Sequence, residues 1–210
     1  MGHTPRKTGF PRGYSWDFAG FSLLELLVVV AIALLLTTMY WGSHSDTRAK
    51  EQQAVCLKNL QKLFIAMEIY ANENNAKFPE VAGARTSEEA LDLLVPKYNA
   101  DKSLFICPGS KDLPLPAGEP LRGQKISYAY YMGRRSTEAQ AALMSDKQVD
   151  ALAKAAGQDV FSSNGKPPGN NHEKLGGNFL FCDGHAEGSA ARATFAVPLA
   201  EGVVLLNPKP

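Results

Sequence analysis

A long apolar segment near the N-terminus constrains this 210-residue chain more than any other feature. Residues 21–40 read FSLLELLVVVAIALLLTTMY, in which sixteen of twenty residues are apolar and Glu25 is the only charged one. A helix of twenty residues is about 30 Å long, which matches the hydrocarbon core of a bilayer. An apolar perimeter of this length is not typical of an amphipathic surface helix. Residues 21–40 are therefore predicted to form a transmembrane helix.

Two other structures are compatible with the apolar segment. One is a helix buried in a large core, and the other is a cleaved secretory signal peptide, since Arg6, Lys7 and Arg12 precede the segment. Against a signal peptide, Glu25 lies inside the start of the apolar core, and the exit TTMYWGSHS has no pair of small residues at Ala-x-Ala spacing. Three Lys or Arg residues lie in 1–20 and three in 41–60, so the charge count does not orient the segment.

The overall composition excludes several classes of protein. Lys+Arg is 22 and Asp+Glu is 21, a formal charge of +1, so no overall basic field favours nucleic acid as a partner. An apolar fraction of 45% with 20% charged residues indicates a folded chain. Three cysteines are too few for a small domain built on disulfides and too scattered for a zinc ribbon.

The segment Gly20-Phe21-Ser22-Leu23-Leu24-Glu25 follows a short basic leader, residues 1–20. It resembles the processing site of type IV prepilins and type II secretion pseudopilins. The resemblance implies cleavage between Gly20 and Phe21 by a prepilin peptidase and methylation of the new Phe21 amine. It also implies a single-pass protein of the bacterial inner membrane, with a cytoplasmic N-terminus and a periplasmic or extracellular head that enters a filament on assembly.

Glu25 is the residue that the resemblance connects to assembly. A carboxylate in lipid costs a few kcal/mol or more and therefore needs a partner. In the family, that partner is the N-terminal amine of a neighbouring subunit, which here is Phe21 of the next copy. The alternative is local stabilisation of Glu25 by the dipole at the start of its own helix.

The helical pattern continues beyond the apolar segment. Apolar residues recur at steps of three and four, and the pattern stops at a cluster of Asn residues and Pro79; they are Cys56, Leu60, Leu63, Met67 and Tyr70. We expect one helix from about residue 21 to 74. Its continuation, residues 41–75, would pack against a globular α+β head, residues 76–210. The resemblance implies a pilin-like fold with a small antiparallel sheet.

Within the head, strands are predicted at 104–107, 126–132, 179–182 and 203–206, with a return strand from His185 after a turn at Asp183-Gly184. Residues 136–157 are rich in Ala, Gln, Glu and Lys, and predict one or two exposed helices. No Gly-x-Ser-x-Gly, His-Glu-x-x-His or phosphate-binding glycine loop occurs, so the sequence favours a non-enzymatic protein.

A dense cluster near the C-terminus resembles a signature of bacterial prepilin-like proteins, in which nine residues separate a His from Asp-Gly. Here ten residues intervene. The members are His172, Gly176, Gly177, Asn178, Asp183, Gly184 and His185. Cys56-x-x-Asn59-Leu60 and Phe105-x-Cys107-Pro108 also resemble motifs of that group. The resemblance covers most of residues 15–190.

Imidazole, thiolate and carboxylate groups in this cluster suit a zinc-type ion, with His172, Cys182, Asp183 and His185 as candidate ligands. Adjacent residues on a strand point to opposite faces, however. We therefore favour a hairpin in which Asp183 caps backbone N–H groups and accepts a hydrogen bond from His172, with no metal. Calcium needs six or more oxygens, and Asp183 and Glu187 with loop carbonyls are too few. No cofactor is expected.

Cys56 and Cys107 would enter an oxidising compartment on export, where they could form a disulfide. Two buried reduced thiols are an equal alternative, and Cys182 is unpaired in either case.

The favoured function is a pseudopilus subunit of a type II secretion-type system. Its expected partners are like subunits, the prepilin peptidase, the secretion or pilus assembly machinery and the inner membrane. A type IV pilus subunit for adhesion, motility or DNA uptake is the nearest alternative. Another class is a membrane-anchored metal- or ligand-binding protein that uses His172, Asp183 and His185.

Overall fold

The structure is a computed structural model that describes residues 22–210, with the side chains of residues 40–46 excepted. The predicted leader, its final residue Gly20 and the following Phe21 lie outside the described residues. The chain divides into two units, Met1–Ser43 and His44–Pro210, which are described separately. Helix α1 (Leu23–Glu73) contributes residues to both units and agrees with the single long helix predicted from the sequence.

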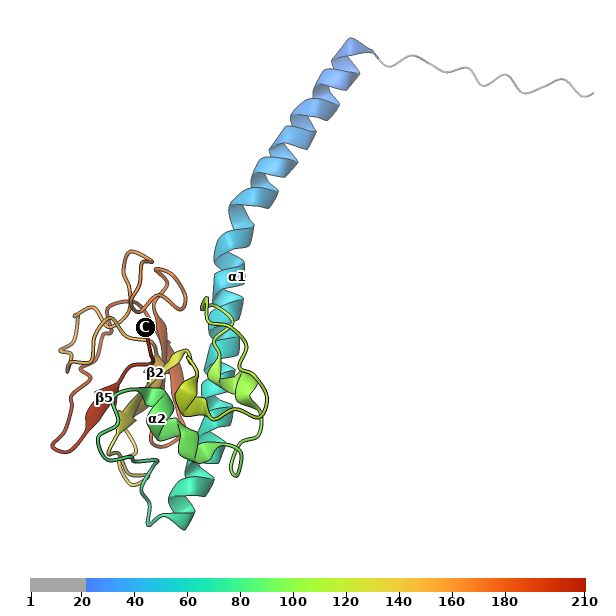
Figure 1. Ribbon diagram of the computed structural model, residues 1–210. Helices are drawn as coiled ribbons and strands as arrows, with labels where there is room; N and C mark the ends of the chain where they lie inside the picture. The colour runs from blue at the N-terminus through green and yellow to red at the C-terminus, as the bar shows by residue number, and fades with distance from the viewer. Residues whose placement is uncertain (1–21) are drawn as a thin grey trace, which may run out of the picture. The chain divides into compact units, whose positions relative to one another are not determined.

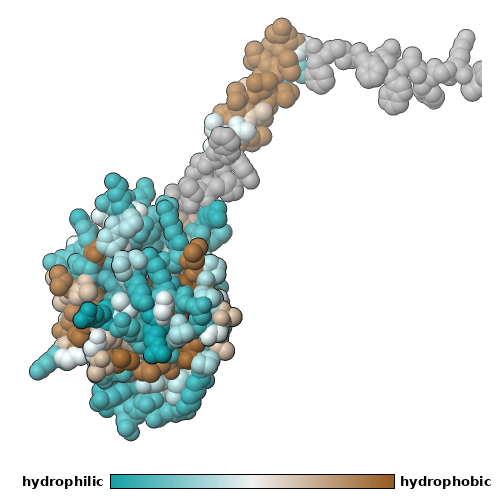
Figure 2. Space-filling view, viewed as in Figure 1, coloured by the Kyte–Doolittle hydropathy of each residue, from teal (hydrophilic) through white to brown (hydrophobic). Residues whose placement is uncertain are grey.

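In the first unit, the described residues form the start of helix α1. Glu25 lies in its first turn. Side chains from Leu23 to Met39 are exposed all around the helix, and Figure 2 shows a mostly apolar surface on this segment. Across the residues that the structure describes, no helix combines the length and the apolar character needed to cross a membrane. The transmembrane assignment of residues 21–40 stays a prediction.

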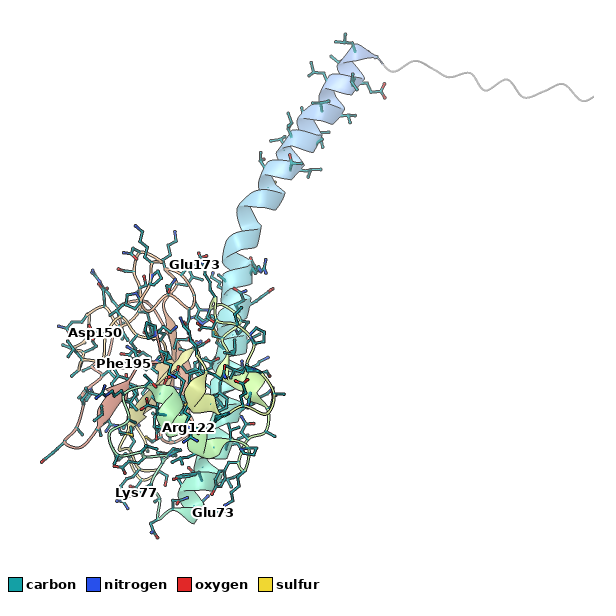
Figure 3. All side chains as sticks on the ribbon, in the orientation of Figure 1. Glu73, Lys77, Arg122, Asp150, Glu173 and Phe195 are labelled. Carbon is teal, nitrogen blue, oxygen red and sulfur yellow. A yellow bond between two sulfur atoms is a disulfide. The ribbon has the colours of Figure 1, made fainter. Side chains whose placement is uncertain are left out.

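In the second unit, helix α1 packs one face into the core of the head. The buried side chains on that face are Cys56, Leu60, Leu63, Met67 and Ala71. The helix ends at Glu73, after which Asn75 and Ala76 adopt φ values of 56° and 61°, outside the helical range. Lys97 and the Tyr98 hydroxyl donate to Glu73 Oε2 at 2.5 and 2.6 Å, at the end of the helix marked by Glu73 in Figure 3.

Five antiparallel strands form the sheet of the head (Figure 1), in the spatial order β4-β3-β2-β1-β5. They are β1 (Tyr128–Met132), β2 (Ala142–Asp146), β3 (Gly177–Phe181), β4 (Ala186–Ser189) and β5 (Val204–Leu206). A short helix, α2 (Ser87–Leu91), and 3-10 helices at Asp92–Leu94, Lys102–Phe105 and Leu121–Gly123 precede them. The predicted α+β class with an antiparallel sheet is confirmed.

Both faces of the sheet are buried. Tyr128 and Tyr130 of β1 lie in the core cluster that contains the helix α1 residues, whereas Ala129 and Tyr131 lie in a second cluster. Loop residues, among them Phe161, Ala193 and Val197, complete that second cluster. Phe195 (Figure 3) extends this cluster, because the centroids of the Phe195 and Phe179 rings are 5.2 Å apart. Residues 193–197, for which the sequence predicted no role, therefore cover the second face.

Two local predictions are wrong. Residues 104–107 are not a strand, because Lys102–Phe105 is a 3-10 helix whose start is capped by the Asp101 side chain, which accepts from Ser103 N at 3.0 Å. Residues 136–157 are not exposed helices, because they contain β2, a fully buried inner strand of the sheet. Packing between two strands overrides the helical preference of an Ala-rich segment. The strands predicted at 126–132, 179–182 and 203–206 are present as β1, β3 and β5.

Candidate functional site

A buried carboxylate, Asp146, organises the interior of the head. Asp146 is the last residue of β2 and is fully buried. Its Oδ2 accepts from the backbone N and the Nδ2 of Asn178, at 2.7 and 3.0 Å. Its Oδ1 accepts from Asn171 Nδ2 at 2.8 Å. Because a buried carboxylate is costly unless its oxygens are paired, these contacts are what allow Asp146 to sit inside the core.

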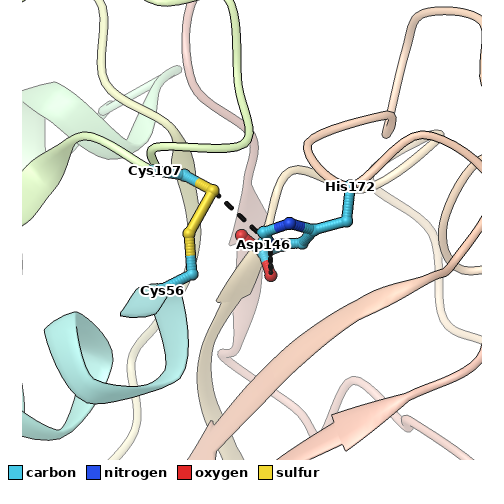
Figure 4. A group of neighbouring side chains, drawn as sticks. All are labelled: Cys56, Cys107, Asp146 and His172. Carbon is cyan, nitrogen blue, oxygen red and sulfur yellow. Dashed lines mark hydrogen bonds and ion pairs between the residues drawn. A yellow bond between two sulfur atoms is a disulfide. The ribbon is translucent and has the colours of Figure 1, made fainter. Parts of the chain in front are cut away.

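His172 is the next member of this buried cluster (Figure 4). Its Nε2 lies 3.2 Å from Asp146 Oδ2 and 3.4 Å from Cys107 Sγ. Its Nδ1 is buried and has no hydrogen-bond partner among the described residues. A Cβ at Gly109 would lie 2.6 Å from Nδ1. The imidazole is therefore held through Nε2 on one side and confined by the Gly109 backbone on the other.

The sulfur that faces His172 belongs to a disulfide. Cys56, on helix α1, is bonded to Cys107, in the segment after the 3-10 helix Lys102–Phe105, with Cα atoms 5.3 Å apart. Near the bond, Asn59 Nδ2 donates to the carbonyl of Ile106 at 3.3 Å. One covalent bond and one hydrogen bond thus fasten helix α1 to this segment.

Asn178 joins the same cluster to helix α1. Its Nδ2 also donates to the backbone carbonyl of Gln53 at 3.0 Å, and Gln53 Nε2 donates to the carbonyl of Gly177 at 3.2 Å. The Asn171 amide similarly reaches the carbonyl of Ser127 at 2.7 Å. These side-chain amides connect the helix to β3, and the loop before β3 to the segment that leads into β1.

The signature has two adjacent glycines, and each position excludes a side chain for its own steric reason. Gly176 has φ +103°, and a Cβ there would lie 2.0 Å from the carbonyl oxygen of Ser189. A Cβ at Gly177 would lie 2.7 Å from the Phe161 ring. A side chain at either position would collide with β4 or with the second core cluster, so the pair allows β3 to approach its neighbours closely.

The remaining signature residues form the turn between β3 and β4. Asp183 Oδ1 accepts from the backbone N of His185 at 2.9 Å, and Gly184 has φ +83°. Asp183 and His185 are exposed. His185 stacks on Phe181 with ring centroids 5.6 Å apart and lies beside a surface pocket of about 680 Å³. The turn thus has the backbone contact that Asp183 was expected to make.

The structure does not bring together the ligand set His172, Asp183 and His185. His172 is buried beside Asp146, whereas Asp183 and His185 lie in the exposed turn. The expected hydrogen bond from His172 to Asp183 is therefore wrong, because Asp146 takes the place of Asp183. Cys182 is buried, and burial raises the pKa of its thiol to about 12, so the thiol remains protonated at neutral pH.

The buried cluster does not have the geometry of a nucleophilic relay. In such a relay the nucleophile and the orienting carboxylate contact different nitrogens of the His. Here Cys107 and Asp146 both approach Nε2 of His172, and the Cys107 sulfur is already bonded to Cys56. What the cluster does offer is a convergence of sulfur, nitrogen and oxygen ligand atoms from four separate segments of the head.

Sequence reasoning missed Asp146 and Asn171. The signature drew attention to His172 and Asn178, but nothing in its spacing indicates a partner within residues 136–157, which were predicted to be exposed. A run of apolar residues in front of Asp146, Ala141-Ala142-Leu143-Met144, was the available signal for a buried strand.

One comparison with known proteins found a match. Residues 17–40 match the family model described as the prokaryotic N-terminal methylation motif. No curated protein and no solved structure matches the chain. The matched segment contains Gly20, Phe21 and Glu25, and it does not include the head, so the C-terminal signature stays a prediction.

Proposed function

We propose that this chain, whose methylation motif identifies it as a prepilin-like precursor of the type IV pilin or pseudopilin kind, is a non-enzymatic subunit of a type II secretion-type pseudopilus. The motif supports processing and assembly into a filament, which pilins and pseudopilins share. A basic leader, Gly20, Phe21, Glu25 and the apolar run occur in the order that processing and assembly require. Prepilin-like proteins are structural subunits, and the proposed non-enzymatic role rests on that.

Processing is proposed to cut between Gly20 and Phe21 and to methylate the amine of Phe21. A glycine lets the backbone approach a protease without a side-chain clash. Mass spectrometry of the mature N-terminus tests this step, and an N-methylated Phe21 is the expected result. Gly20→Val should leave the leader attached, whereas Gly13→Val, in the same leader, should be processed normally. A mature chain that begins at Met1, or near Ser43, would overturn the proposal.

The apolar surface of helix α1 is proposed to lie in the bacterial inner membrane before assembly and in the filament core afterwards. Leu23, Leu35 and Met39 are 81%, 65% and 76% exposed in the isolated chain. Exposed apolar surface of this extent is unfavourable in water and needs lipid or other subunits to cover it. The N-terminus would be cytoplasmic, and the head periplasmic or extracellular.

Glu25 is proposed to pair with the Phe21 amine of a neighbouring subunit and so to set the register of assembly. Glu25→Gln removes the charge and keeps the shape, and it should abolish recovery of assembled subunits from sheared or cross-linked cells. Glu51→Gln is the matched control, since Glu51 is an exposed glutamate further along the same helix. Equal assembly of the two variants would contradict the role of Glu25.

The nearest alternative is a type IV pilus subunit for adhesion, motility or DNA uptake. A deletion strain separates the two functions. Loss of protein secretion with intact surface fibres supports the pseudopilus, and loss of fibres with intact secretion supports the pilus. The secretion or pilus assembly machinery would be the partner in each case.

A further inference from the structure

We propose that reduction of the Cys56–Cys107 disulfide creates a four-ligand site for a zinc-type divalent cation. The ligands would be the two cysteine sulfurs, Nε2 of His172 and a carboxylate oxygen of Asp146. These four atoms lie within 4.8 Å of one another, and all four residues are buried. Figure 4 shows them converging from helix α1, the Cys107 segment, β2 and the loop before β3.

The ligand set matches the chemistry of the proposed ion. Zinc is commonly bound by thiolate, imidazole and carboxylate ligands in a tetrahedral arrangement. Bond lengths of about 2.0–2.3 Å place the ligand atoms of such a site roughly 3.3–3.8 Å apart. Nε2 of His172 already lies 3.2 Å from Asp146 Oδ2 and 3.4 Å from Cys107 Sγ. The main change needed is the separation of the two sulfurs.

The surroundings hold the nitrogen and oxygen ligands in place. Asp146 is fixed by Asn178 and Asn171, which leaves Oδ2 directed at His172. Gly109 confines the opposite side of the His172 ring. Metal sites depend on hydrogen bonds of the kind that Asp146 receives to orient their ligands, and these bonds do not involve the disulfide.

Disulfide and ion exclude one another, because a disulfide offers no thiolate. A phosphine reductant supplies two electrons and becomes the phosphine oxide, taking its oxygen from a water molecule whose two protons convert Cys56 and Cys107 to thiols. Binding of the ion then releases both thiol protons. In either state the same two sulfurs link helix α1 to the Cys107 segment, once through a covalent bond and once through the metal.

The test uses the full chain in detergent, with zinc alone as the probe. Oxidised and phosphine-reduced samples are given zinc, passed through a chelating column and measured for metal by elemental mass spectrometry. We expect about one zinc per reduced chain, as four ligands would form one site, and none per oxidised chain. Cobalt in place of zinc should give a thiolate-to-cobalt charge-transfer band with the reduced chain alone.

Variants assign the ligands. Cys56→Ser with Cys107→Ser should lose zinc, whereas Cys182→Ala, which alters the third cysteine, should keep it. Asp146→Asn should lower the affinity at least tenfold. If reduction unfolds the head, zinc should restore its circular dichroism, because metal binding then supplies folding free energy. The proposal would be overturned if the reduced chain took up no zinc or failed to refold with zinc. Equal zinc binding by the reduced parent chain and the double serine variant would also overturn it.

Discussion

The carboxylate of Asp146 lies 3.2 Å from Nε2 of His172, although one residue ends β2 and the other belongs to the loop before β3. Asp146→Ala would leave His172, Asn171 and Asn178 buried without their shared acceptor. Leaving a buried donor without its acceptor typically costs about 1–3 kcal/mol. We expect a loss of this size in the free energy of unfolding, measured by urea denaturation. Asp183→Ala removes an exposed turn contact and should cost about 1 kcal/mol; equal losses would contradict the role of Asp146.

The disulfide between Cys56 and Cys107 encloses a sequence separation of 51 residues. Removing it frees a loop of that length in the unfolded chain, at an expected cost of about 4 kcal/mol. Cys56→Ser with Cys107→Ser should therefore unfold at lower urea than the oxidised chain. Adding a reductant should lower the midpoint of the parent chain and leave that of the double variant unchanged. If the reductant lowered the urea midpoint of the double variant as well, a bond other than Cys56–Cys107 would be responsible.

Gly109, two residues after Cys107, is closely packed against Asn171 and His172. A Cβ there would lie 2.6 Å from both Asn171 O and His172 Nδ1. Gly109→Ala should thus destabilise the head by about 1–3 kcal/mol, as overpacking of a core does. Gly123→Ala provides the matched control, because nothing lies within 4 Å of a Cβ at that position. Thermal unfolding of the two variants side by side is the measurement.

The Cys182 thiol should resist modification in the folded chain. Burial raises its pKa from 9.0 to about 12, so little thiolate is present at neutral pH. We expect no maleimide label on the oxidised native chain and one label, at Cys182, in denaturant without reductant. Because the folded pKa is the higher one, the stability linked to this thiol is complete below pH 9.0 and falls as the pH rises toward about 12. Rapid labelling of the native chain would contradict this.

The parts of the fold that follow a regular pattern were predictable. The period of Cys56, Leu60, Leu63 and Met67 predicted the buried face of helix α1, and alternation predicted β1. β2 was missed because the Ala-, Gln-, Glu- and Lys-rich composition of residues 136–157 favours a helix, whereas the strand is fixed by its hydrogen bonds to β1 and β3 on either side.

The candidate site was predictable only in part, for a related reason. His172 and Asn178 belong to the predicted signature, but the predicted partner of His172 was Asp183, which lies near it in sequence. Asp146 is the actual partner because β2 pairs with β3 and brings its final carboxylate beside Asn178. Spacing within a motif carries no information about a residue that only the sheet register brings close.

The order of strands has a consequence for the sequence of events during synthesis. β1 is the first strand to be made, and one of its two edges is paired by β5, the last. Until Val204 and Leu206 have been added, the backbone groups of Met132 and Tyr130 on that side have no partner strand. Unpaired edges invite association with other chains, so the nascent head is exposed to such association for as long as this edge of β1 stays open. A chain shortened before Val204 would keep that edge permanently bare.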